Sequence, residues 1–265
     1  MIRALLTGGV LLCAGAPVLA NDLVEQHLAA LHADFDAPVA AALDAIDGTG
    51  RRLLAARSYL RSAAHLAERW SWTEAQIEAY AGSPEQVRLD AAIARVRCEF
   101  EVANPGYTLF VNPVIRSLDV QIEHWNHNDS VTRAAEGMLG DVSAAVAAAK
   151  FPKAGTPVGK AAFQRLLAGH EPQPKPTIAA PGLSLHGRMQ AVDFQVKAGE
   201  RIVAGPEVAS IDESWEVTGW KLKLQAAVES ADVGFRGPLQ DPYEPWHYDF
   251  QPEPDRAFAV VACGR

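Results

Sequence analysis

The sequence has 265 residues, of which 49% are hydrophobic and 21% are charged, and its formal net charge is −8. These values are typical of a folded globular protein and argue against a disordered chain. Because an acidic chain without a lysine and arginine cluster is poorly suited to a phosphate backbone, we expect no nucleic-acid partner.

The first twenty residues are predicted to be a secretory signal peptide. Arg3 supplies a positive charge, residues 4–16 form a short apolar stretch, and small or slim residues precede a cleavage point after Ala20. The apolar stretch is shorter than the roughly 20 residues that span a bilayer. We therefore expect a periplasmic or secreted protein with no permanent membrane anchor.

Residues 21–82 are predicted to form a helical N-terminal region. Apolar residues recur at steps of three and four over residues 22–35, a break follows at 47–50, and a second helix continues from there. The many alanines favour helix as well. The pattern indicates a helical hairpin, and the sequence assigns no role to it.

A second domain is expected over residues 83–265. Ser83 and Pro84 mark the start of a helix that continues to about residue 100. We expect a short strand over 107–111 and helices over 115–125 and 131–150. The prolines of residues 171–182 predict an extended surface loop.

The apolar pattern changes to period two after Leu183. Val192, Phe194 and Val196 point to one face of a strand, which places Asp193 on the other face. A helix over 215–231, a proline-rich turn over 238–245 and a strand over 258–263 complete the prediction. This order predicts an α+β fold, in which a small antiparallel sheet with flanking helices follows the helical N-terminal region.

Side chains that bind metal ions occur in two stretches. His186 and Asp193 lie seven residues apart, and Glu244 and His247 follow about fifty residues later. Two imidazoles and one carboxylate would leave the fourth position of a tetrahedral Zn²⁺ open for water, as in a catalytic site. Glu244 is then available to take a proton from that water. Because Pro245 favours an extended backbone, a turn or bulge between residues 244 and 247 is required to bring both side chains to one side.

The pattern Ser-x-His-(x)6-Asp, followed by Glu-x-x-His, resembles the zinc D-alanyl-D-alanine peptidases, which include VanY-like carboxypeptidases and VanX-like dipeptidases. The resemblance covers about residues 84–265. It implies that His186, Asp193 and His247 bind zinc and that Glu244 is the general base.

Three further positions enter through the same resemblance. Arg116, in the segment Arg116-Ser117-(x)3-Gln121, is implied to stabilise negative charge on the substrate carbonyl. Ser184 either contacts the substrate or caps the turn before His186. Met189 stands where the family usually has glycine, and we expect it to take ordinary backbone angles and to alter the local turn.

The resemblance implies an exported zinc metallopeptidase that hydrolyses peptidoglycan stem peptides or other D-alanine-containing peptides, in the first place as a D-alanyl-D-alanine carboxypeptidase. Two alternatives stay open. One is a peptidoglycan endopeptidase, and the other is a non-catalytic periplasmic module that binds wall peptide with the same fold.

The remaining cysteines and histidines give weaker signals. Once the signal peptide is removed, Cys98 and Cys263 either form a disulfide or remain as two buried thiols. His124 and His127 lie three residues apart on an expected helix and can face one metal ion. We favour surface positions for both.

Overall fold

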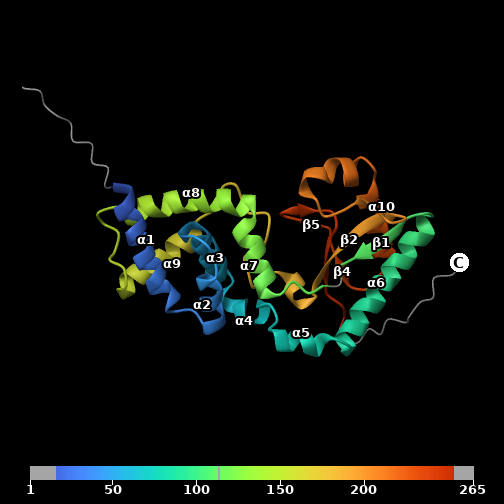
Figure 1. Ribbon diagram of the computed structural model, residues 1–265, viewed down its shortest axis with the longest axis horizontal. Coiled ribbons are helices and arrows are strands. Elements are labelled where there is room, and N and C mark those ends of the chain that lie inside the picture. The colour runs from blue at the N-terminus through green and yellow to red at the C-terminus, as the bar shows by residue number, and fades with distance from the viewer. Residues whose placement is uncertain (1–15, 113, 254–265) are drawn as a thin grey trace, which may run out of the picture. The chain divides into compact units, whose positions relative to one another are not determined.

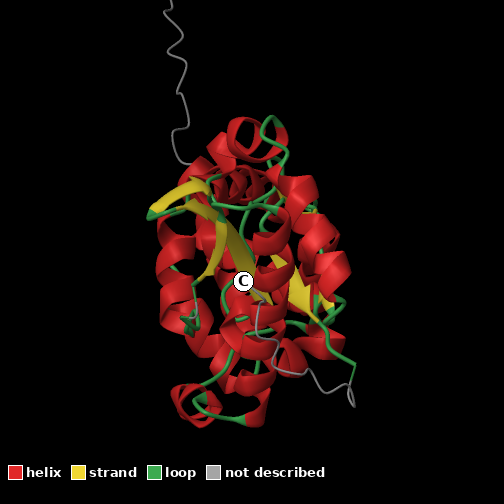
Figure 2. Cartoon of the chain, turned by 90° about the vertical axis from the view of Figure 1, so that its right-hand side faces the viewer, coloured by secondary structure: helices red, strands yellow, loops and turns green. Residues whose placement is uncertain are grey.

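The computed structural model describes residues 16–112 and 114–253. Its fold is α+β, with long helices and a small antiparallel sheet, as predicted (Figures 1 and 2). The described residues divide into two compact units, of which the first combines residues 16–63 with 126–176 and the second combines 64–112, 114–125 and 177–253. This division does not follow the predicted boundary between residues 82 and 83.

The first unit is helical throughout its described residues. Its helices are α1 (Ala16–His32), α2 (Ala37–Asp44), α3 (Thr49–Arg61), α8 (Asp129–Val146) and α9 (Pro157–Gly169). Both α1 and α3 pack against α8 and α9. The approach of α3 to α8 is close at Gly50, where an added Cβ would lie 2.5 Å from the carbonyl oxygen of Ala135.

The expected N-terminal hairpin is therefore part of a larger helical unit. Its apolar face is covered by Met138 and Val142 of α8 and by Phe163 and Leu167 of α9, all of which are fully buried. These residues lie beyond the predicted domain boundary, and α9 was not predicted. The early helices complete their core with a segment that is distant in sequence, so a boundary drawn from local patterns separated the two.

Several predictions fall near the chain ends. The predicted signal peptide lies mostly outside the described residues, and its cleavage point after Ala20 lies within α1. The predicted strand over 258–263 and Cys263 also lie outside them, whereas Cys98 takes part in a disulfide. Among the described residues, every helix is too short or too polar to span a bilayer.

The second unit is built on a five-stranded sheet. Strands β1 (Thr108–Val111), β2 (Ala191–Ala198), β7 (His247–Phe250) and β4 (Phe235–Arg236) follow in that order, and β3 (Arg201–Ala204) also pairs with β2. Each pairing is antiparallel. A separate hairpin joins β5 (Leu239–Gln240) to β6 (Tyr243–Glu244).

Two helices, α6 (Pro84–Ala103) and α10 (Trp220–Ala231), pack against each other and supply much of the core on one face of this sheet. As predicted, Val192, Phe194 and Val196 of β2 are buried in that core. Ser83 caps α6 by accepting a hydrogen bond from the Gln86 amide at 3.1 Å. The alternating side chains of β2 and β7, including Asp193 and His247, therefore lie on the opposite face.

Shorter helical segments complete the description of this part of the chain. They are α4 (Leu66–Arg69), α5 (Glu74–Tyr80), α7 (Leu118–His127) and the turn η2 (Leu185–Arg188), of which η2 contacts β2. Helix α7 begins three residues later than predicted, which leaves Arg116 in the loop between β1 and α7.

We expect Gly50→Ala to destabilise the protein by about 1–3 kcal/mol, because the new Cβ would meet the backbone of α8, which cannot move aside easily. Gly140→Ala on α8 is the matched control, since its Cβ would have no neighbour within 4 Å, and we expect it to be neutral or stabilising by up to about 1 kcal/mol. Urea denaturation measures both, and equal stability of the two variants would contradict this packing.

Candidate metal centre

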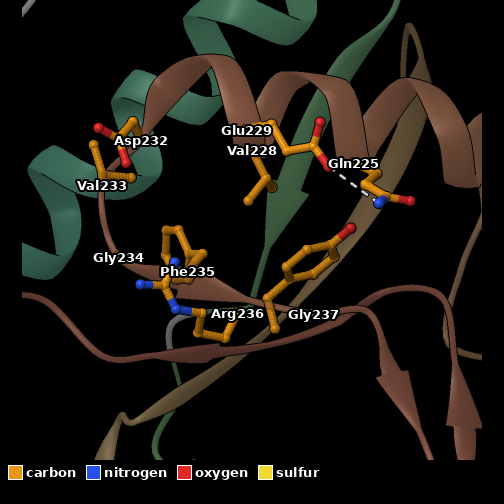
Figure 3. Close-up of a pocket in the computed structure, with 10 residues that line it drawn as sticks. Gln225, Val228, Glu229, Asp232, Val233, Gly234, Phe235, Arg236 and Gly237 are labelled. Carbon is orange, nitrogen blue, oxygen red and sulfur yellow. Dashed lines mark hydrogen bonds between the residues drawn. The ribbon is translucent and has the colours of Figure 1, made fainter.

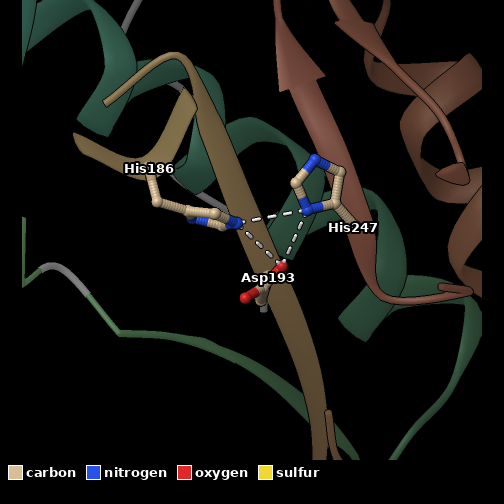
Figure 4. A group of neighbouring side chains, drawn as sticks. All are labelled: His186, Asp193 and His247. Atoms are coloured by element: carbon tan, nitrogen blue, oxygen red, sulfur yellow. Dashed lines mark hydrogen bonds and ion pairs between the residues drawn. The ribbon is translucent and has the colours of Figure 1, made fainter. Parts of the chain in front are cut away.

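Three predicted ligands converge in the second unit, on the face of the sheet opposite to α6 and α10. Asp193 and His247 are direct partners in the antiparallel register of β2 and β7. His186 reaches the same point from the turn η2, which immediately precedes β2 (Figure 4). The side chains are largely buried, with exposed fractions of 10 to 13%.

The three donor atoms form a nearly equilateral triangle. Nε2 of His186 lies 3.1 Å from Nδ1 of His247, and Oδ1 of Asp193 lies 3.3 Å and 3.2 Å from these two nitrogens. Ligands at 2.0–2.1 Å from a tetrahedral metal ion are separated by roughly 3.3–3.4 Å. The triangle thus has the size of one face of a tetrahedral coordination shell.

Both hydrogen bonds and a bound cation are compatible with this triangle. If both imidazoles direct a proton to Asp193, the two N–H groups crowd each other at 3.1 Å. If only His247 does, its Nδ1–H lies within hydrogen-bond distance of both Oδ1 of Asp193 and the lone pair of His186 Nε2. A positive ion between the three atoms satisfies all of them at once, so the arrangement is compatible with a bound metal ion.

Two further side chains hold the ligands in place. Arg116 donates a hydrogen bond from Nη2 to Oδ2 of Asp193 at 2.7 Å, which leaves Oδ1 directed to the site. Nε2 of His247 lies 3.1 Å from Oδ1 of Asp249, so this nitrogen carries the proton and Nδ1 remains a ligand. Sequence reasoning missed Asp249, although His-x-Asp in one strand places both side chains on one face.

These contacts shift the ionisation of the ligands. Burial lowers the pKa of His247, but its hydrogen bonds to Asp193 and Asp249 outweigh burial and raise the pKa to about 9. Burial raises the pKa of Asp193, yet the hydrogen bonds from both histidines and the Arg116 charge hold it well below its usual range. Burial lowers the pKa of His186. At neutral pH the metal-free site therefore contains an ionised Asp193, a neutral His186 and a protonated His247.

Backbone contacts hold the turn that carries His186. The Trp72 amide donates a hydrogen bond to the Gly187 carbonyl at 3.1 Å. The buried amide of Gln121 donates to Ser71 Oγ at 2.8 Å and to the Arg116 carbonyl at 2.7 Å. An added Cβ on Gly187 would lie 2.6 Å from Gln121 Nε2, so only glycine fits here. Gln121, which the sequence pattern included without a role, thus links the loop of Arg116 to the segment of Ser71 and Trp72 that contacts the turn.

Met189 corrects a prediction. Its φ of 50° and ψ of 31° place it in the left-handed region, whereas we expected ordinary backbone angles. The left-handed conformation costs about 1–2 kcal/mol for a residue with a Cβ. Burial of the side chain in the core of the second unit offsets a cost of this size. The backbone at Met189 therefore keeps a turn conformation suited to glycine. Strand β2 begins two residues after Met189, at Ala191.

Glu244 lies beside the triangle, with Oε2 3.6 Å from Nδ1 of His247. Strand β6 ends at Glu244 and β7 begins at His247, so Pro245 and Trp246 form the turn that the prediction required. Burial raises the pKa of Glu244. The positive charge of His247 lowers this pKa and the negative charge of Asp193 raises it, and the net shift is upward. A carboxyl group with a raised pKa is suited to receive and release protons near neutral pH.

The other predicted residues have separate positions. Ser184 stands at the N-cap of η2, but its side chain makes no capping hydrogen bond there, so substrate contact remains the prediction for it. His124 and His127 are exposed on α7, and neither belongs to the metal-binding group found among the described residues. A role of Arg116 at a substrate carbonyl also stays a prediction.

A cavity of about 310 Å³ lies between α10 and the β4–β7 edge of the sheet (Figure 3). Val228 and Glu229 line it on one side, and Phe235, Arg236 and Tyr248 line it on the other. Because Tyr248 alternates with His247 along β7, this cavity lies on the face opposite to the metal ligands. It is therefore not part of the candidate metal centre.

No protein-family model, curated protein or solved structure matches this chain.

We expect the affinity for a divalent transition-metal ion to increase with pH up to about 9, because the metal must displace the proton of His247. The apparent Kd should fall about tenfold per pH unit between pH 7 and 9 and then level off. Competition with a chromophoric chelator measures this dependence.

Asp249→Asn is the matched variant for this measurement, because it removes one of the three carboxylates that raise the pKa of His247, the other two being Asp193 and Glu244. Its plateau should begin at a lower pH than in the unchanged protein. A pH-independent Kd between pH 7 and 9 would contradict the assigned protonation state.

Proposed function

We propose that the chain is a zinc metallopeptidase that hydrolyses peptidoglycan peptides, in the first place as a D-alanyl-D-alanine carboxypeptidase. The observation that carries the proposal is a group of three potential metal ligands, two imidazoles and one carboxylate, with a second, protonatable carboxylate beside it. His186, Asp193 and His247 present donors within 3.1–3.3 Å of one another, and Glu244 lies 3.6 Å from His247.

The donor set supports zinc as the metal. Two imidazole nitrogens and one carboxylate oxygen suit Zn²⁺, whereas Ca²⁺ and Mg²⁺ prefer oxygen donors throughout. Three protein ligands at tetrahedral spacing also leave a position for water or substrate. A zinc ion held here would lower the pKa of a water molecule and polarise a peptide carbonyl.

Glu244 then acts as the general base and later as the general acid. Its carboxylate takes a proton from the attacking water and delivers it to the leaving amine, which requires a pKa nearer to neutrality than that of an ordinary glutamate. Burial of the side chain raises the pKa of Glu244, which is the direction that this role requires. The turn at Pro245 and Trp246 places the carboxylate on the same side of the strand as His247.

Arg116 supports the same reaction in two ways. It holds Asp193 through one nitrogen, and its side chain as a whole is 42% exposed. Its remaining N–H donors are proposed to contact a substrate carbonyl as negative charge develops on it. Ser184, next to the turn that carries His186, is proposed to contact the substrate. The predicted signal peptide would direct the chain to the compartment that contains peptidoglycan.

We expect Glu244→Gln to lower turnover by about 10²–10⁴-fold while one equivalent of zinc still binds, because the amide keeps the shape of the side chain but cannot accept the proton. His247→Ala is the matched variant and should lose both zinc and turnover. Metal analysis and mass spectrometry of digested muropeptides measure the two effects.

The digest also separates the proposed activity from its alternatives. Release of one terminal D-alanine supports the carboxypeptidase, whereas opened cross-links would indicate an endopeptidase. Undiminished turnover in Glu244→Gln would remove Glu244 from the mechanism. Stoichiometric zinc without any turnover in the unchanged protein would favour a binding module.

A further inference from the structure

The hairpin that carries Glu244 stands apart from the main sheet. Among the described residues, β5 and β6 pair with each other in a sheet of their own, with Leu239 opposite Glu244 and Gln240 opposite Tyr243. An isolated two-stranded hairpin is marginally stable in water. The position of the Glu244 carboxylate therefore depends on contacts that the hairpin makes with the rest of the unit.

Tyr243 makes such contacts. Its hydroxyl donates a hydrogen bond to the carboxylate of Glu216. The ammonium group of Lys221 lies 3.2 Å from Oε1 of Glu216 and 5.1 Å from the centre of the Tyr243 ring. Each of the three side chains thus contacts the other two, and we call this set the Tyr243 cluster.

The other side of the cluster is firmly anchored. Glu216 ends a π-helical turn, η4 (Asp212–Glu216), in which Trp215 is fully buried and donates a hydrogen bond to the Gly205 carbonyl at 2.8 Å. Lys221 lies in the first turn of α10, directly after the buried Trp220. The cluster therefore ties the hairpin to a well-packed segment.

The adjacency of Tyr243 and Glu244 connects this contact to the metal centre. Neighbouring side chains of a strand point to opposite faces. When the hydroxyl of Tyr243 is held on one face, the Glu244 carboxylate is directed to the other, where it lies 3.6 Å from Nδ1 of His247. Because misplacing a reacting group by about 1 Å can cost on the order of 10² in rate, such a contact affects turnover.

We propose that the Tyr243 cluster is a clamp that positions Glu244, and that Tyr243 is a positioning residue for the reaction proposed above. The effect on turnover rests on the proposed function. The effect on the stability of the hairpin is independent of the proposed function, because it follows from the contacts of Tyr243 with Glu216 and Lys221.

Tyr243→Phe tests the clamp, because it removes the hydroxyl and keeps the ring. We expect amide hydrogen exchange over residues 239–244 to become about tenfold faster, while exchange in β2 and β7 stays unchanged. In the zinc-loaded enzyme, kcat should fall about tenfold, whereas KM and zinc stoichiometry should not change. Glu216→Gln should have a smaller effect, since the amide oxygen still accepts the hydrogen bond from Tyr243.

Tyr107→Phe and Glu200→Gln are the matched controls. The ring centres of Tyr107 and Trp220 lie 4.4 Å apart, and Oε2 of the exposed Glu200 lies 3.1 Å from Nζ of Lys197. Each control therefore removes the same chemical group as its counterpart, but outside the hairpin and the Tyr243 cluster. Both should leave hairpin exchange and kcat unchanged.

Hairpin exchange in Tyr243→Phe equal to that in Tyr107→Phe would overturn the clamp, whether or not the chain is a peptidase. Faster exchange with an unchanged kcat would overturn the positioning role. If the unchanged protein shows no turnover at all, the proposed function fails, and faster hairpin exchange in Tyr243→Phe still supports the clamp.

Discussion

The register of β2 against β7 is the constraint on which the candidate metal centre depends. It places Asp193 directly opposite His247, while Val192 and Phe194 enter the core beneath α6 and α10. A slip of one residue would turn Asp193 into that core and move an apolar side chain into the site. The energy of burying the apolar face of β2 thus also fixes the metal ligands on the other face.

The charges of the site balance one another without a metal ion, and this has consequences for stability. Asp193 is buried, and it stays ionised because Arg116 and the protonated His247 contact it. Because the pKa of His247 is higher in the folded protein than in an unfolded chain, its protonation stabilises the folded metal-free protein. This contribution is complete at pH values below the ordinary pKa of histidine, and it is lost as pH increases through about 9. A divalent ion bound at these three side chains would take the place of that proton.

Local patterns in the sequence predicted β2, which carries Asp193, but not strand β7, which carries His247, nor all of the contacts that hold these side chains. Period two in β2, the cap at Ser83 and the spacing of the ligands are local signals, and the structure brings His186, Asp193, His247 and Glu244 together. The composition of the two units was not predictable in this way, because an amphipathic helix such as α3 does not identify which later segment covers it. The left-handed backbone of Met189 was missed because its side-chain burial, which offsets the strain, depends on tertiary packing.

The central claim is that three side chains from η2, β2 and β7 hold one zinc ion. Diffraction data collected on either side of the zinc absorption edge, from crystals of protein purified without chelators, test it directly. We expect one anomalous peak about 2.0–2.2 Å from Nε2 of His186, Nδ1 of His247 and Oδ1 of Asp193. Zinc bound elsewhere in the chain, with these three atoms contacting only each other, would contradict the account.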